Sequence, residues 1–488
     1  MKKFCKSVTV FILSCVFMSL NFAFADKKPV LVHPIVSYNA LYKGETPYDG
    51  IVEYHCVDLK ESEKSKYPAL IKAFTSYNED SEDFALKDYN ETGDDVLFVP
   101  STMQIVRSDS SAFSILSQVY DYSNFLGDTF DTSTGKELMI SDIVTDMNKF
   151  ENTLQQIFTK SYGKLSREEV LDKFYAYRDL NDKPQFNYIL GYDYLTLFPR
   201  SDEDCDVIVM PFKKYPGLFK DKYTEKPDSY IVPVENIGVD FNLKSVPVCV
   251  ENSIFTITYN ENQTHTLNID GKNLNFKTPP DFKAKFIEPY IVRIKSKNYL
   301  YVVFYNDENE PRMSFFDINS NKAERIAPDM NKTFAALEVT TETEKTTVDY
   351  LAFVDPSEFV TESFMEDLGE VLCIEPYKVS LNGKPEKTTK NYILTSEWKG
   401  KWRKDYQDET LRFETLKDLK MKNDKGKTVT VPKGTILMYV ETDNKSWAIF
   451  ELENKSRLRA DTHIFKGKDA DKSTICGFKI FDALSLLN

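Results

Sequence analysis

The stretch that most constrains the fold is Asp128–Val144, which reads DTFDTSTGKELMISDIV. Phe130 ends an expected strand, and Asp131–Gly135 forms a turn that glycine closes. Leu138 and Ile140 alternate inward on the expected return strand, and the residues after them resemble the start of a helix. A β-hairpin that leads into a helix predicts a fold in which sheets and helices are mixed.

The first 25 residues have the three parts of a secretory signal peptide. Three lysines near the start precede an apolar run at Val8–Leu20 and a small-x-small site at Ala23–Ala25. That run is shorter than the roughly 20 residues that a membrane-spanning helix needs. We therefore predict cleavage between Ala25 and Asp26. Cys15 faintly resembles a lipoprotein cysteine, but apolar residues continue past it, so a lipoprotein is not favoured.

Length and charge exclude several classes of protein. A mature chain of this length suggests about three domains of roughly 150 residues each. The sequence has 62 basic and 76 acidic residues, and the acidic excess is spread along the chain without a basic stripe. We therefore expect no nucleic-acid or anionic-lipid partner. No second long apolar segment occurs, which predicts an exported protein without a transmembrane segment, whether periplasmic, at the cell surface or secreted.

The cysteines do not suggest a disulfide framework. Five remain after cleavage, at scattered positions and without a C-x-x-C pair, so we predict neither a required disulfide nor a zinc site. Most of them are expected to be buried apolar residues. They are Cys56, Cys205, Cys249, Cys373 and Cys476.

Residues 26–243 predict an α+β module, in which helices cover one face of an antiparallel sheet. A helix is expected from Tyr67-Pro68, followed by an acidic loop at Asn78–Asp95. Two further helices are expected, one at Met147–Tyr162 and one capped by Ser166 and Glu169. The expected strands are Val30–Tyr38, Ile51–Val57, Met103–Arg107, Ala112–Tyr122, Phe186–Leu190, Tyr194–Phe198 and Val207–Phe212.

The rest of the chain predicts two β-rich parts. Residues 244–400 suggest an all-β segment, either a sandwich or a propeller-like meander, with one short helix at Glu358–Leu368. Lys399–Gln407 resembles a linker, and residues 408–488 predict a small SH3-like β-barrel. The expected strands are Ile254–Tyr259, Thr264–Ile269, Leu300–Tyr305, Met313–Ile318, Val348–Phe353, Val429–Val431, Thr435–Val440, Ser446–Leu452, Arg457–Arg459 and Phe478–Ile480.

Three blocks of sequence together resemble one secreted bacterial family. Its signature is the extracytoplasmic module shared by the sigma-V-type anti-sigma factor and the C-type peptidoglycan deacetylase. The blocks are Arg107–Ile115 with Tyr120–Tyr122, Phe130–Leu138 and Ser141–Ile143; Tyr194–Phe212; and Val354–Phe359 with Leu368-Gly369. The resemblance implies an extracytoplasmic α+β module and covers about half of the chain. It does not include the deacetylase catalytic domain.

The family's distinctive loop is altered in this chain. Members usually carry Gly-Gly-Ala-His-Gly before the hairpin, whereas Ser123–Asp128 has no histidine here. In the sigma-V relative the module binds lysozyme, and that ligand is not carried over. We expect this edge to border any partner-binding surface. The alternative for the two tyrosines is that they only pack within the sheet. The candidate residues are Tyr120, Tyr122, Asn124 and Phe125.

Motifs for catalysis are not found. Four histidines lie far apart, and no H-E-x-x-H or G-x-S-x-G motif occurs. His33 and His55 lie in neighbouring expected strands, but packed or surface histidines are favoured over a metal site. The many tyrosines and phenylalanines suit either sugar binding or a β-rich core, and the core is favoured. We assign no catalytic, cofactor-binding or metal-binding residue.

The expected function is recognition at the cell envelope without catalysis. The partner would be a wall glycan, a wall peptide or a protein. The first alternative is a cell-wall-acting hydrolase or a deacetylase-associated enzyme, and the second is a structural envelope protein.

Overall fold

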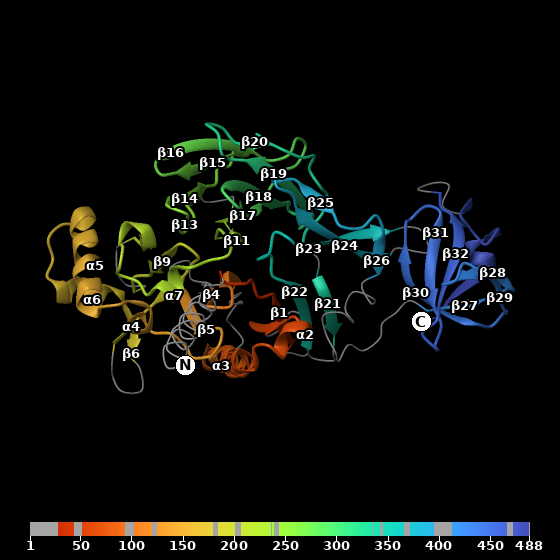
Figure 1. The fold of residues 1–488 in the computed structure, drawn as a ribbon, viewed down its shortest axis with the longest axis horizontal. Helices are drawn as coiled ribbons and strands as arrows, with labels where there is room; N and C mark the ends of the chain where they lie inside the picture. Colours follow the sequence, from red (N-terminus) through yellow and green to blue (C-terminus); the bar gives the residue numbers. More distant parts are fainter. Residues whose placement is uncertain are drawn as a thin grey trace, which may run out of the picture.

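Strands form most of the molecule, in several antiparallel sheets with fewer helices, which agrees with the α+β prediction in outline. Figure 1 shows an elongated chain in which α5 and α6 lie at one end and the C-terminal strands at the other. The predicted signal peptide, with Ala25 and Asp26, lies outside the described residues. The computed structural model describes residues 28–42, 51–92, 102–119, 124–178, 184–200, 206–235, 237–238, 244–334, 336–341, 345–365, 371–394, 412–465 and 472–487.

The N-terminal hairpin pairs with a hairpin from far along the chain. The sheet has the strand order β2-β1-β22-β21, and Ile35 pairs with Leu351 while Leu41 pairs with Lys345. Hydrogen bonds therefore cross the predicted division between residues 243 and 244. The strands are β1 (Pro34–Tyr42), β2 (Ile51–Leu59), β21 (Ala336–Thr341) and β22 (Lys345–Leu351).

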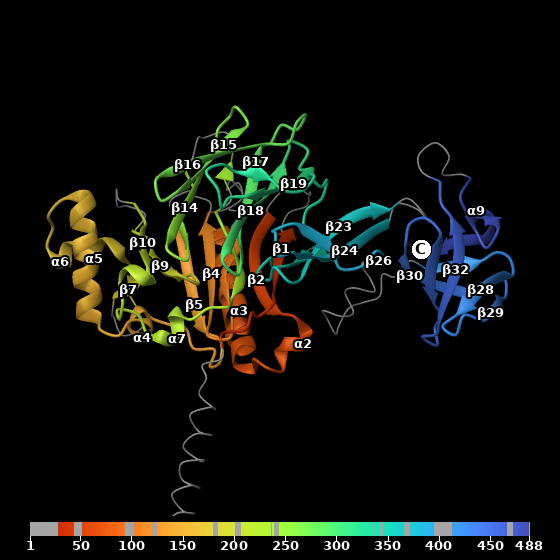
Figure 2. The ribbon, with the colours of Figure 1, turned by 45° about the horizontal axis from the view of Figure 1, so that its top comes forward.

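A long helix packs against this sheet and its neighbour (Figure 2). After the short α2 (Glu61–Lys64), α3 begins at Pro68 as predicted, but it continues to Thr92. The predicted loop at Asn78–Asp95 is therefore wrong. That stretch contains no proline or glycine before Gly93, and most of its polar residues are compatible with the exposed face of a helix.

The glycine-closed turn predicted within Asp128–Val144 is confirmed, but the predicted return strand is reduced to one isolated bridge. Strands β3 (Thr102–Ser108), β4 (Ala112–Val119) and β5 (Asn124–Asp131) form a meander. Gly135 N donates to Asp131 O at 2.8 Å, which closes the turn. Phe130 forms a single bridge with Glu137, and Ile140 then begins α4 (Ile140–Ile143), so its prediction as a strand residue is wrong.

The next helices and strands agree closely with the sequence. The helix at Met147–Tyr162 has the predicted bounds, and Ser166 and Glu169 form the predicted capping box. The predicted meander is present with the order β10-β9-β8, but the strand predicted at Phe186–Leu190 is divided, because Phe186 ends β7, which pairs with β6, and Tyr188 begins β8. The elements are α5 (Met147–Tyr162), α6 (Arg167–Phe174), β6 (Tyr175–Arg178), β7 (Pro184–Phe186), β8 (Tyr188–Leu190), β9 (Tyr194–Leu197), β10 (Ile208–Pro211), η1 (Phe212–Lys214) and α7 (Asp221–Thr224).

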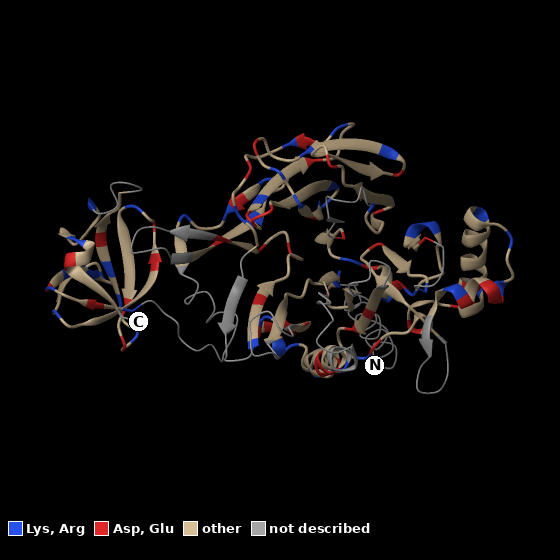
Figure 3. Ribbon diagram, turned by 180° about the vertical axis from the view of Figure 1, so that it is seen from behind, with Lys and Arg blue, Asp and Glu red and all other residues tan. Residues whose placement is uncertain are grey.

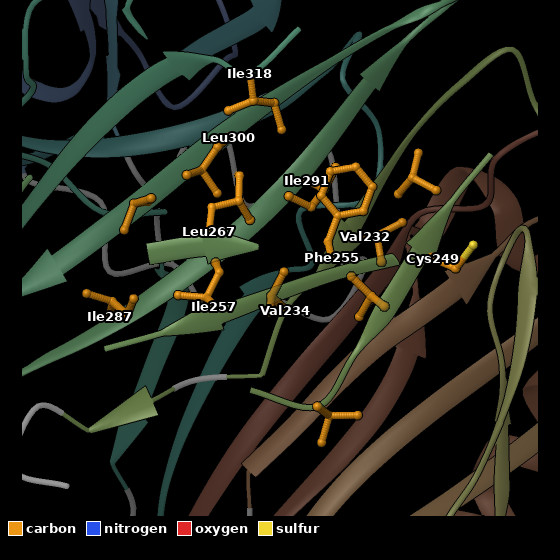
Figure 4. Close-up of a cluster of buried hydrophobic side chains, with 14 of the residues drawn as sticks. Val232, Val234, Cys249, Phe255, Ile257, Leu267, Ile287, Ile291, Leu300 and Ile318 are labelled. Carbon is orange, nitrogen blue, oxygen red and sulfur yellow. The ribbon is translucent and has the colours of Figure 1, made fainter. Parts of the chain in front are cut away.

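Two stacked sheets enclose a large apolar core, of which Figure 4 shows one part. One sheet is the meander β13 to β16, and the other has the order β11-β17-β18-β19-β20 with β12 beside β17. The strands are β11 (Ser229–Pro233), β12 (Ile237–Gly238), β13 (Val248–Val250), β14 (Ser253–Thr258), β15 (Thr264–Ile269), β16 (Lys272–Lys277), β17 (Phe286–Ile294), β18 (Lys297–Tyr305), β19 (Pro311–Asp317) and β20 (Glu324–Arg325).

The predicted helix at Glu358–Leu368 is wrong, because β23 (Phe359–Met365) occupies this part of the chain. Phe359, Val360 and Thr361 are aromatic or β-branched residues, which suit a strand, and β24 supplies the partner strand. Such a short apolar run does not separate helix from strand by its sequence alone.

The C-terminal strands continue from the preceding sheet without a break in pairing. Tyr392 of β26 pairs with Thr442 of β30, and β30 pairs in turn with β31. The predicted linker at Lys399–Gln407 lies outside the described residues. The elements are β24 (Val371–Val379), β25 (Pro385–Lys387), β26 (Tyr392–Leu394), β27 (Arg412–Thr415), β28 (Leu419–Asn423), β29 (Thr428–Val431), β30 (Ile436–Thr442), β31 (Trp447–Glu451), β32 (Arg457–His463), β33 (Thr474–Ile475), β34 (Phe478–Lys479), α9 (Ile480–Ala483) and β35 (Leu484–Leu487).

Charges of both signs are scattered over the described chain, as Figure 3 shows. Within the described ranges, no helix combines the length and the apolar composition needed to cross a membrane.

Gly135 provides a test of the hairpin's packing. Its φ is +66°, and an added Cβ would lie 2.2 Å from Ala69 O at the start of α3. Gly217 has a similar φ of +69°, but no atom lies within 4 Å of its added Cβ. Gly217→Ala should cost about 1–2 kcal/mol from the left-handed backbone alone. Gly135→Ala should cost about 1–3 kcal/mol more, because the backbone of α3 has to move.

The measurement is amide hydrogen exchange in β5 and α3, which reports the free energy of local opening. Equal losses at these amides in the two variants would contradict the close packing of the turn on α3.

Candidate functional site

The sequence-predicted binding edge is described only in part. Tyr120 and Tyr122 lie outside the described residues, and Asn124 is placed in β5 opposite Val119. The ring of Phe125 packs on Phe198, with 5.3 Å between ring centroids. Phe125 therefore contributes to packing within the module, and a binding role for this edge stays a prediction.

The first residues of the family-like block form a buried polar network around Arg107. The side chain of Arg107 is fully buried, and its Nε donates to Asp109 Oδ2 at 2.9 Å. Its Nη1 donates to the carbonyls of Gly191 and Tyr223 at 3.2 and 2.6 Å, and Nη2 donates to Glu225 O at 2.9 Å. One guanidinium therefore joins β3 to two segments more than eighty residues later in the chain.

Two aspartates of the block, Asp109 and Asp131, hold turns in place. Asp109 Oδ1 accepts from the amides of Ser111 and Ala112 at 2.7 and 3.1 Å. Asp131 pairs with Lys222 and accepts from Ser133 Oγ, and these contacts lower the pKa of Asp131 to about 2 although burial opposes them. Every described polar contact of Arg107, Asp109 and Asp131 is made within the module. These residues of the block therefore stabilise the fold.

His33 lies between two carboxylates. Its Nδ1 is 3.0 Å from Glu63 Oε1 and its Nε2 is 3.0 Å from Asp355 Oδ2, so both ring nitrogens must carry protons to donate. Burial alone would lower the pKa of His33, but the two carboxylates raise it to about 9. The protonated ring therefore ties the start of β1 to α2 and to the loop before β23.

The other histidines do not form a metal site with His33. His55 pairs with Tyr38 on the β1–β2 ladder, while His33 lies beyond the end of that ladder, next to Lys60. His265 is buried and stacks on Tyr259 with 4.0 Å between ring centroids. Burial lowers the pKa of both His55 and His265 to about 4. Across the described ranges, no group of three or more His, Cys, Asp or Glu could hold a metal ion.

A different surface combines a carboxylate with several aromatic rings, and the sequence did not indicate it. We call it the Glu288 site and define it by Phe286, Glu288, Tyr290, Tyr305 and Tyr350. The first three alternate along β17 and are partly exposed, whereas the residues between them are buried. Tyr305 lies opposite Phe286 on β18, and Tyr350 on β22 is 38% exposed.

The carboxylate of Glu288 is held by tyrosine hydroxyls. Tyr305 Oη donates to Glu288 Oε2 at 3.1 Å and also lies 2.9 Å from Thr333 Oγ1. Tyr290 also hydrogen-bonds to Glu288. Desolvation nevertheless dominates and raises the pKa of Glu288 to about 7.

Packed rings fix the positions of these tyrosines. Tyr305 stacks on Phe286 with 4.4 Å between centroids and 8° between planes. Tyr290 contacts Phe334 and Phe353 in edge-to-face geometry, each at 5.3 Å. The hydroxyl groups around Glu288 are therefore preorganised by an aromatic core.

Glu288 differs from several other poorly exposed carboxylates in having no cationic partner. No Lys, Arg or His of the described chain pairs with it, and no nearby charge lowers its pKa. By contrast, a lysine pairs with each of Asp131, Asp193, Glu251 and Glu375. Glu288 is a partly exposed residue whose carboxylate is desolvated among tyrosines and has no counter-ion, which suits it to binding a polar or cationic ligand.

Part of this site could have been found from the sequence. The stretch Phe286–Ile291 alternates aromatic or acidic residues with apolar ones. This pattern indicates a strand with one buried face and one face that is more exposed to solvent. The approach of Tyr305 and Tyr350 to Glu288 depends on the pairing of strands far apart in the chain.

Comparison with known proteins gives no relative, since no family model, curated protein or solved structure matches this chain.

The His33 bridge predicts a specific dependence of stability on pH. Because folding raises the pKa of His33 from 6.5 to about 9, its contribution is complete below pH 6.5 and is lost as the pH rises through 9. The pKa values of Glu63 and Asp355 are lowered, so their contribution is present above their usual pKa and is lost at acidic pH. His33→Gln should therefore remove about 3 kcal/mol of unfolding free energy near pH 6, and much less above pH 9.

Urea denaturation of both proteins between pH 5 and pH 10 measures this difference. His463→Gln is the matched control, because His463 is exposed, and its pH profile should follow that of the wild type. A difference between His33→Gln and wild type that does not change with pH would contradict the charged bridge.

Proposed function

We propose that this chain is an exported protein that recognises a component of the cell envelope without altering it chemically. The partner would be a wall glycan, a wall peptide or another envelope protein, and not a nucleic acid. The signal-peptide pattern supports export to the periplasm, the cell surface or the medium.

The Glu288 site is the observation that carries this proposal. It offers hydroxyl groups, aromatic surface and one carboxylate, which is the mixture that binds sugars and polar peptides. Its side chains are held by strand pairing and ring packing before any ligand arrives, so little ordering is needed on binding.

The finer domain assignments belong to the same proposal. The chain would be a distant member of the family with the anti-sigma-factor and deacetylase module, and its helices would cover one face of the sheet in residues 26–243. Residues 408–488 would form an SH3-like barrel. Arg107, Asp109 and Asp131 would then be family-like residues because they stabilise the module.

An enzyme acting on the cell wall is the second candidate. The raised pKa of Glu288 is the property that a general acid needs. Glycoside hydrolysis normally needs a second carboxyl group at a set separation, and Glu362, which also acts on Tyr350, is the carboxylate to test with Glu288. A structural envelope protein is the third candidate, and it would bind no ligand at Glu288.

The purified mature protein should retain an envelope component and turn over none. We expect capture of peptidoglycan fragments or of an envelope protein on the immobilised chain, with no hydrolysis or deacetylation of peptidoglycan, chitin oligomers or acetylated glycans. Tyr350→Ala should weaken capture by about tenfold, because it removes the exposed ring of the site.

Tyr162→Ala is the matched control, because Tyr162 is similarly exposed, at 39%, and lies on α5. Turnover that is lost in Glu288→Gln would establish the enzyme instead. If the wild type and Tyr350→Ala capture envelope material equally, the Glu288 site is not where that material binds.

A further inference from the structure

The missing counter-ion of Glu288 indicates which chemical group the site would take. Burying a carboxylate without a cation nearby costs free energy, and the structure offsets this cost only with neutral tyrosine hydroxyls. A ligand that brings a positive charge would recover that cost on binding. A neutral ligand would leave it unchanged.

We propose that the Glu288 site binds an organic ammonium group, with the Glu288 carboxylate as its counter-ion and tyrosines around it. This inference deepens the proposed recognition function and rests on it. An ammonium group has three N–H donors. One can reach Glu288, and the others can reach the hydroxyl oxygens of Tyr290 and Tyr305, which can accept as well as donate.

The aromatic rings favour an organic cation over a metal ion. Tyr350 is 38% exposed, and its pKa is raised by partial burial first and then by the nearby carboxylates of Glu362 and Glu288. An exposed tyrosine ring beside the carboxylate can attract a cation through its face. Calcium and magnesium instead need about six oxygen ligands, and the site supplies one carboxylate.

Two envelope sources could supply this ammonium group. One is an amino sugar whose nitrogen carries no acetyl group, and the other is the side-chain amine of a wall peptide. Both present the same charged nitrogen, and acetylation removes that charge in both. Comparing each with its acetylated form therefore tests the ammonium directly and identifies the source.

The experiment is isothermal titration calorimetry of the mature protein at pH 7 with four probes. These are a glucosamine tetramer, an N-acetylglucosamine tetramer, a lysine-containing tetrapeptide whose N-terminus is blocked, and the Nε-acetylated form of that peptide. We expect one of the free amines to bind at least about tenfold more tightly than its acetylated form. Glu288→Gln should lose about ten- to hundredfold in affinity for that amine.

The pH dependence provides a second readout. The titratable groups that face Glu288 are Tyr290 on its own strand, Tyr305 on β18 and Tyr350 on β22, while Glu362 on β23 faces Tyr350. All three tyrosines stay neutral below pH 9, because their pKa values are raised. Affinity for a lysine amine, which stays charged over this range, should therefore rise from pH 6 to pH 8 as Glu288 ionises, and this rise should be absent in Glu288→Gln.

Glu308→Gln is the control, because it removes one exposed carboxylate just beyond β18 and should leave the affinity unchanged. Equal binding of an amine and its acetylated form would overturn the ammonium inference and leave recognition standing. Binding of none of the four probes would overturn the ammonium inference. The proposed recognition function would fail separately, if capture of envelope material is also absent.

Discussion

The interaction on which the N-terminal module depends is the burial of Arg107. A fully buried guanidinium is tolerated only where its donors are satisfied, and here one carboxylate and three carbonyls accept from it. Those acceptors come from the turn after β3, the turn before β9 and the segment at and after α7. Removing any of these partners would leave charge or polar groups buried without hydrogen bonds, so the module has to fold as a unit.

A second constraint comes from strands that are far apart in the sequence. Pairing of β1 with β22 brings the N-terminal hairpin beside strands from beyond residue 340, and the His33 bridge to Asp355 lies at the same junction. Pairing between such distant segments is slow to form, because loop-closure entropy is lost before the contacts exist. Tyr350 of β22 also lies near enough to Glu288 of β17, in another sheet, for the carboxylate to act on its pKa.

The sequence predicts local structure better than it predicts the site. The Gly135 turn, the helix at Met147–Tyr162 and the Ser166 capping box follow from short-range rules, and the structure confirms them. The helix assigned to Glu358–Leu368 fails because a partner strand, which the sequence does not reveal, decides the conformation. The Glu288 site was missed for a similar reason, since its tyrosines converge only after three strands have been placed in two sheets.

Our central proposal is that the Glu288 carboxylate is preorganised to bind a positively charged ligand. Carbon-13 NMR of glutamate-labelled protein measures it most directly, with the Glu288 carboxyl resonance assigned by its loss in Glu288→Gln. We predict that this carboxyl titrates near pH 7 in the free protein, and that its midpoint falls to the ordinary glutamate value of about 4.3 or lower when the preferred amine is bound. A free-protein midpoint at the ordinary value for glutamate, or a midpoint that the bound amine does not move, would contradict it.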